Sequence, residues 1–225
     1  DRIIGVVTCG EREDILLSAY GGKCIRFPVI DVRVFKGRDS LGVRGIRLAQ
    51  NDHVISMSTL DHTELEVHDR DQYLRWSSAR RRDVQDGEPK IDTVPTHLEF
   101  LSQQEQFVLS ITENGYGKRS SSYEYRTAGR GGQGIINIET SSRNGAVVAS
   151  GPVAENDQIM LVTDSGRLIR IVVDEIRVAG RNTQGVTLFD IEEKERVVSV
   201  AWMTDLTEEE NVDEMPSVTE NQEDN

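Results

Sequence analysis

Residues 159–186 read IMLVTDSGRLIRIVVDEIRVAGRNTQGV. The stretch contains an apolar run, a turn glycine, a second run, a Gly-Arg pair and a final glycine that opens another apolar run. Runs of four to six residues rich in Val and Ile, separated by turn dipeptides such as Ser165-Gly166, are typical of short antiparallel strands. We therefore expect this stretch to fold as β-strands.

The same order of features occurs three times along the chain. In each copy a turn glycine and a final glycine stand 19 or 20 residues apart, as the pairs Gly22 and Gly42, Gly115 and Gly134, and Gly166 and Gly185. A run rich in Val or Ile accompanies the copies at residues 3–6, 54–57, 147–150 and 197–200. Four short strands per copy and a period of about 50 residues are characteristic of a propeller blade.

The repeats predict an all-β fold made of β-propeller or β-pinwheel blades, each with four short antiparallel strands. We place the units at about residues 1–50, 51–143 and 144–204. Each blade needs a neighbour on either side to bury its faces, and three blades make half of a typical closed ring. We therefore expect a partial ring that lacks its N-terminal partners. The start at Asp1, without an initiator Met, suggests a fragment or a processed product.

The middle unit is longer than the others because it contains an insertion at about residues 61–106. Tyr73, Trp76 and Ala79 follow helical spacing there, so we expect a short helix. The insertion also holds Arg80-Arg81-Arg82, the densest basic run of the chain. This run is either a solvated helix end or an accessory phosphate contact.

Charge is distributed unevenly along the chain. The formal net charge is −13, yet residues 205–225 alone carry nine carboxylates and no Lys or Arg. We expect this segment to be a disordered acidic tail, because it has little apolar surface to bury. Residues 22–48 instead contain seven Lys or Arg against two Asp. A basic body with an acidic tail suits a polyanion binder, in which the tail either competes for the basic surface or only aids solubility.

The Gly-Arg pairs supply candidate phosphate contacts. Arg38, Arg130 and Arg181 occupy the same position in each copy. A neighbouring glycine lets the backbone approach an anion closely, and arginine offers a planar fork for phosphate oxygens. The alternative is a turn device whose arginine pairs with a carboxylate of the blade. The full candidate set is Lys23, Arg26, Lys36, Arg38, Arg44, Arg47, Lys118, Arg119, Arg130 and Arg181.

Other chemistry finds no support in the sequence. No apolar run approaches the roughly 18 residues that span a bilayer, so no membrane role is expected. Cys9 and Cys24 lack CxxC spacing, and the four histidines show no metal-ligand spacing. No GxxxxGK[ST] loop is present. We therefore expect no metal, no cofactor and no catalytic residue in this chain.

Three motifs resemble the C-terminal domain of bacterial DNA gyrase A. They are GRDSLGVRGIRL at residues 37–48, ENGYGKR at 113–119 and GRNTQGV at 180–186. The resemblance extends to about residue 204, apart from the insertion, and the acidic tail also looks like the end of gyrase A. It implies the last three blades of a six-bladed β-pinwheel that wraps double-stranded DNA around a basic rim, as part of an ATP-dependent type II topoisomerase that introduces negative supercoils.

The resemblance has further implications and limits. It implies a cytoplasmic bacterial A2B2 complex with gyrase B, in which other domains use ATP and Mg²⁺ and carry the catalytic tyrosine. The family's box, Gln-Arg-Arg-Gly-Gly-Lys-Gly, belongs to a blade that this chain lacks, and only GRGGQG at residues 129–134 is similar. Two alternatives stay open: the equivalent domain of topoisomerase IV, and a propeller-type scaffold that binds acidic proteins.

Overall fold

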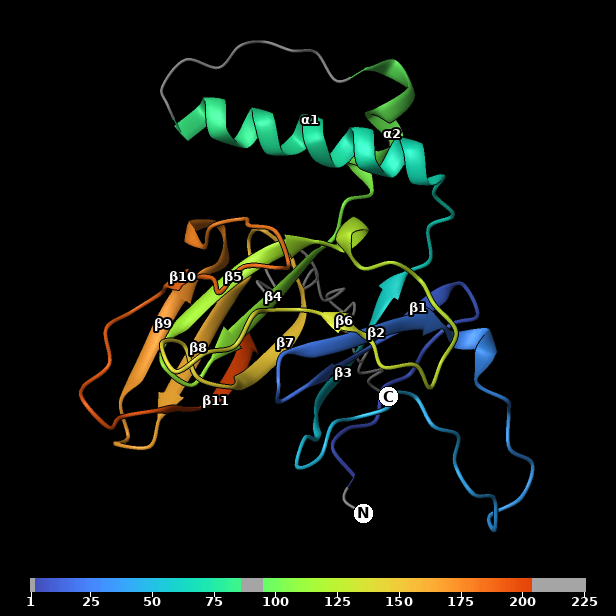
Figure 1. Cartoon of the computed structure of the whole chain (residues 1–225), viewed down its shortest axis with the longest axis horizontal. Helices are drawn as coiled ribbons and strands as arrows, with labels where there is room; N and C mark the ends of the chain where they lie inside the picture. Colours follow the sequence, from blue (N-terminus) through green and yellow to red (C-terminus); the bar gives the residue numbers. More distant parts are fainter. Residues whose placement is uncertain (1–2, 86–94, 204–225) are drawn as a thin grey trace, which may run out of the picture.

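The computed structural model describes residues 3–85 and 95–203, whose strands form three antiparallel sheets (Figure 1). The first sheet has the order β3-β1-β2-β6. Its strands are β1 (Glu13–Ala19), β2 (Lys23–Pro28), β3 (Val54–Asp61) and β6 (Ile135–Ile136). The all-β fold with four-stranded blades is thereby confirmed.

The second sheet repeats this plan, and the third repeats it without an outer strand among the described residues. The second sheet has the order β10-β5-β4-β7, and the third has the order β11-β8-β9. The second is built from β4 (Phe107–Thr112), β5 (Tyr116–Ser121), β7 (Val147–Val153) and β10 (Val186–Thr187). The third is built from β8 (Gln158–Thr163), β9 (Leu168–Val172) and β11 (Val197–Met203).

Each four-stranded sheet receives its outer strand from the next sequence repeat. Ile135 of β6 lies opposite Cys24 of β2, and Val186 of β10 lies opposite Gly117 of β5. The sheets therefore do not coincide with units divided at residues 50 and 143. In the described part of the chain, β9 has no outer partner.

The hydrophobic cores lie between adjacent sheets. On β4, Val108 packs toward Leu16 of the first sheet, whereas the next residue, Leu109, packs toward Ile159 of the third sheet. Consecutive strand residues point to opposite faces, so a central strand with a blade on either side is apolar on both faces. This arrangement explains the continuous apolar runs in the repeats.

A short 3₁₀ turn follows the second strand of each hairpin. These turns are η1 (Val29–Asp31), η3 (Ser122–Glu124) and η4 (Val173–Glu175). Each strand hairpin has its β-turn, at Gly22, Gly115 or Gly166, at one end, and the 3₁₀ turn lies at the other end. We call it the 3₁₀ end.

The insertion folds as helices outside the sheets, which confirms the expected helical segment. It contains α1 (Val67–Gln85), η2 (Thr96–Leu98) and α2 (Glu99–Gln103). Tyr73 of α1 packs edge-on against Tyr123 of η3, with ring centroids 5.4 Å apart. In Figure 1, α1 runs across the top of the view, above the second sheet.

Candidate nucleic-acid interface

Two arginines of the predicted set are buried structural pins. Arg26 is 5% exposed, and its Nε donates to Asp14 Oδ2 at 2.7 Å while Nη1 donates to the Ser122 carbonyl at 3.0 Å. Arg119 has the equivalent position on β5, and its Nε donates to the Ile176 carbonyl at 2.7 Å. Each guanidinium therefore binds the 3₁₀ turn region of the following unit, and burial lowers the pKa of Arg119.

Lys118 is also buried, with its side chain directed to the third Gly-Arg pair. Its Nζ donates to the carbonyls of Gly180 at 2.7 Å and Arg181 at 2.6 Å. Burial lowers the pKa of Lys118 from 10.5 to about 7, and nearby Glu124 offsets part of this effect. Arg26, Lys118 and Arg119, which we predicted as phosphate contacts, are desolvated and bound to protein oxygen atoms in this structure.

The second and third Gly-Arg pairs act as tethers between units, whereas Arg38 of the first pair is exposed and forms no side-chain hydrogen bond among the described residues. Arg130 Nε donates to the Asp31 carbonyl at 2.9 Å, and Arg181 Nε donates to the Glu124 carbonyl at 3.1 Å. Asp31 and Glu124 are the last residues of η1 and η3, so the two arginines make the same contact one unit apart. The alternative of a turn device is therefore supported, with backbone carbonyls as the acceptors in place of carboxylates.

Three exposed cations of the predicted set lie where two repeats meet. Gly131 N donates to the Gly45 carbonyl at 2.5 Å, and Arg47 N donates to the Gly132 carbonyl at 2.7 Å. This pairing brings Arg44, Arg47 and Arg130 onto neighbouring segments. Arg181 is half-buried, and the exposed members of the set are Lys23, Lys36, Arg38, Arg44, Arg47 and Arg130.

A second recurring arginine is exposed in all three units. Arg33, Arg126 and Arg177 each stand two residues after a 3₁₀ turn, and we call them the turn-following arginines. None of the three takes part in an ion pair among the described residues. The glycine-based comparison of repeats missed them, although an acidic residue, one residue of any type and an arginine recur at 31–33, 124–126 and 175–177.

Two open clefts at the 3₁₀ end flank α1. One, of about 700 Å³, is lined by Trp76, Arg81 and Arg177. The other, of about 440 Å³, is lined by Arg70, Tyr123 and Arg126. Within the described ranges no three His, Cys, Asp or Glu side chains gather as metal ligands, and no helix is long and apolar enough to cross a bilayer. The first cleft is also lined by Glu155, Asp174 and Glu175, and the second by Glu64 and Glu66, so both offer a ligand arginines, carboxylates and aromatic rings.

The repeated blades match a known domain family. The family model described as DNA gyrase C-terminal domain, beta-propeller, matches residues 21–61, 106–154 and 157–201. The chain belongs to the DNA gyrase C-terminal domain family. The matched segments of this family skip residues 62–105, which hold α1, η2 and α2.

Relatives in the gyrase family cover nearly the whole chain. DNA gyrase A of Granulibacter bethesdensis is 49% identical over 220 residues, which cover 89% of this chain and 23% of that protein. DNA gyrase A of Rickettsia bellii is 42% identical and covers 95% of this chain and 24% of that protein. The chain therefore spans about a quarter of the length of these relatives.

Two solved C-terminal domains have the same fold as this chain. A DNA gyrase A C-terminal domain aligns with a TM-score of 0.61 at 20% identity, covering 86% of this chain and 52% of that one. The C-terminal domain of a DNA topoisomerase IV aligns with a TM-score of 0.60 at 19% identity, covering 85% of this chain and 47% of that one. The topoisomerase IV alternative thus shares the fold, whereas the relatives similar in sequence are gyrase A proteins.

Proposed function

We propose that this chain is a DNA-wrapping module of gyrase A. The observation that carries the proposal is the repetition of one exposed arginine at the same place in three consecutive blades, as Arg33, Arg126 and Arg177. Cations at equal intervals along a curved edge neutralise successive phosphates without reading bases, and they favour a bent duplex. Lys23, Lys36, Arg38, Arg44, Arg47 and Arg130 add exposed positive charge.

The wider role follows from the family. We propose that the wrapped duplex supports ATP-dependent negative supercoiling by a bacterial type II topoisomerase in the cytoplasm, at the nucleoid. Gyrase B and the cleavage machinery would engage other parts of the longer protein. No residue of this chain is given a catalytic role.

The test measures how salt weakens binding of a duplex to the full chain. A variant with Arg33→Gln, Arg126→Gln and Arg177→Gln should flatten the slope of log K against log salt by about 2.7, because each neutralised phosphate contributes about 0.9. A control variant with Arg143→Gln, Lys194→Gln and Arg196→Gln makes the same charge change at the hairpin-turn end. Equal slopes for the two variants, or wild-type binding that ignores salt, would overturn the proposal.

A further inference from the structure

We propose that the outward face of the inserted helix α1 is a second phosphate-binding surface for the same duplex. This inference rests on the proposed function and extends it to residues outside the blades. Helix α1 lies in the part of the chain that the family model does not match. The surface consists of Arg75, Arg82 and the residues between them.

The helix is held rigidly against the blades. Tyr73 is 2% exposed, and its hydroxyl donates to Glu105 Oε2 at 2.9 Å. Arg81 Nη2 donates to both oxygens of the same carboxylate, at 2.9 and 3.1 Å. Tyr123 of η3 donates its hydroxyl to the Leu101 carbonyl at 2.9 Å. Because these contacts fix the inner face, the opposite face has a defined direction before any ligand binds.

The outward face combines arginines with small residues. Arg75, Ser78, Ala79 and Arg82 are exposed, and their spacing of three, four and seven residues places them on one side of the helix. Two turns separate Arg75 from Arg82, about 10 Å along the axis. Phosphates on one strand of a duplex recur every 3.4 Å along its axis, so this distance spans about three of them. Ser78 and Ala79 leave the helix backbone accessible to a close partner.

Charge is segregated along α1 in a way that favours an anion. Residues 72–82 contain four arginines and no Asp or Glu, whereas Asp69 and Asp71 precede this stretch and Asp83 follows it. Arg81 is neutralised by Glu105, and the Arg80 guanidinium lies 5.4 Å from the Trp76 ring. The helix dipole favours Arg82 in the last turn, and Asp71 stands four residues before Arg75 on the same face of the helix. Neither Arg75 nor Arg82 forms an ion pair among the described residues, so both guanidinium groups can contact a polyanionic partner.

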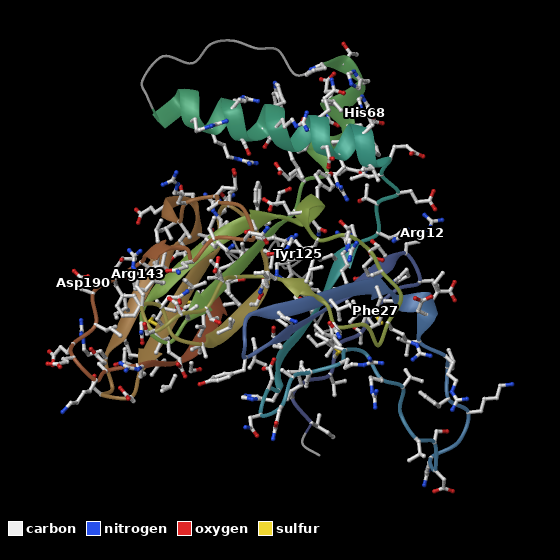
Figure 2. All side chains as sticks on the ribbon, viewed as in Figure 1. Arg12, Phe27, His68, Tyr125, Arg143 and Asp190 are labelled. Atoms are coloured by element: carbon white, nitrogen blue, oxygen red, sulfur yellow. The ribbon has the colours of Figure 1, made fainter. Side chains whose placement is uncertain are left out.

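The position of α1 matches the path of the proposed duplex. The cleft lined by Arg126 meets the helix at Arg70, and the cleft lined by Arg177 meets it between Tyr73 and Arg81. Helix α1 therefore borders two clefts that contain turn-following arginines of consecutive blades. A duplex that contacts both arginines passes beside α1, and side chains project from the helix away from the sheets in Figure 2.

The test uses the full chain carrying Arg75→Gln and Arg82→Gln. Glutamine keeps helix propensity, so circular dichroism should be unchanged. The slope of log K against log salt should flatten by about 1.8, and duplex affinity at 0.1 M salt should fall about sixtyfold, since the two slopes diverge by about 1.8 log units over the decade below 1 M. The matched control is Arg143→Gln with Lys194→Gln, since Arg143 lies far from α1 (Figure 2).

The outcomes separate this inference from the proposed function. If Arg75→Gln with Arg82→Gln leaves the slope at the wild-type or control value, the α1 surface does not bind DNA and the inference is overturned. The proposed function then still stands or falls with the variant of Arg33, Arg126 and Arg177. Binding of an acidic protein to α1, with DNA affinity unchanged, would likewise overturn the inference.

Discussion

Asp14 is fully buried, and its carboxylate is shared between Arg26 and His62. Oδ2 accepts from Arg26 Nε at 2.7 Å, and Oδ1 lies 2.7 Å from His62 Nδ1. Removing one partner of a buried ion pair leaves an uncompensated charge, which is costly. The side chain of Arg26 is therefore important for stability and not for DNA contact.

Replacing Arg26 should test this role directly. We expect Arg26→Met to lower the free energy of unfolding by about 3–5 kcal/mol, because Asp14 loses its cation. Urea unfolding measures the change. Arg170→Met is the matched control, since Arg170 has the equivalent position on β9 but is exposed, and its effect should stay within about 0.5 kcal/mol. Equal losses in both variants would contradict the assignment.

Lys118 should make stability depend on pH. Burial lowers its pKa to about 7, so between pH 7 and 10 the unfolded chain retains a proton that the folded chain has released. The free energy of unfolding of the wild type, relative to Lys118→Met, should therefore rise with pH across this range, by at most about 1.4 kcal/mol per pH unit.

Chemical unfolding at several pH values measures this difference. Lys23→Met serves as the control, because Lys23 is exposed on the neighbouring sheet. A difference between wild type and Lys118→Met that stays flat from pH 7 to 10 would show that the buried amine titrates normally.

The sequence could not distinguish pinning arginines from surface arginines. Arg26 lies on β2, where residues 24–27 are all buried, so the strand shows no alternation between core and surface. Its carbonyl partner on Ser122 is 96 residues away along the chain. The local sequence shows only that Arg26 is a cation near other cations. The groups that compensate its buried charge, the Asp14 carboxylate and the Ser122 carbonyl, meet it only in the folded chain.

At the level of elements, the pairing of the outer strand β10 with β5 depends on a glycine, Gly185, because the two backbones lie close together there. Gly185 has φ of +80°, and a Cβ there would lie 2.7 Å from the Gly117 carbonyl oxygen. Gly166 has a similar φ of +85°, yet a Cβ there would meet nothing within 4 Å. An alanine at position 166 therefore tests the cost of the left-handed backbone alone, whereas an alanine at position 185 adds a steric clash to that cost.

Gly185→Ala should detach β10 from β5. We expect it to cost more than about 2 kcal/mol, whereas Gly166→Ala should cost about 1–2 kcal/mol from its left-handed backbone alone. Amide exchange at Leu188, whose N–H donates to the Gly115 carbonyl at 2.9 Å, should accelerate only in Gly185→Ala. Unchanged exchange at Leu188 would mean that β10 tolerates the side chain.

The elements themselves were largely predictable, but their pairing was not. Helical spacing of Tyr73, Trp76 and Ala79 predicted α1, and the Val- and Ile-rich runs predicted the long strands, except that the run at residues 3–6 forms no strand. A two-residue strand such as β10 has the same local pattern whichever sheet it joins. Its partner is chosen by contacts some 70 residues away, which the spacing of glycines does not reveal.

At the level of the whole molecule, the negative charge of residues 205–225 should weaken the binding of a DNA duplex. Residues 205–225 lie beyond that part of the chain, so the expected disordered tail stays a prediction. Deleting them should tighten duplex binding at low salt, because nine carboxylates no longer compete for the exposed arginines. Salt near 0.5 M should abolish the difference by screening.

A matched control keeps the tail but removes its charge. Changing the nine carboxylates of residues 205–225 to the corresponding amides should reproduce the deletion, whereas a role in solubility alone leaves affinity unchanged. Titration of a fluorescent duplex gives both affinities. Identical binding by wild type, deletion and amide variant would refute competition by the tail.

The borrowed outer strands also restrict how such a protein can change its number of blades. A gene deletion whose breakpoint lies between β9 and β10 removes one blade and also leaves the preceding blade without its outer strand. A deletion of one complete period, from β6 to β10, replaces the lost edge with an equivalent one. Insertions and losses in this lineage should therefore occur in whole periods, with breakpoints at matching places in successive repeats.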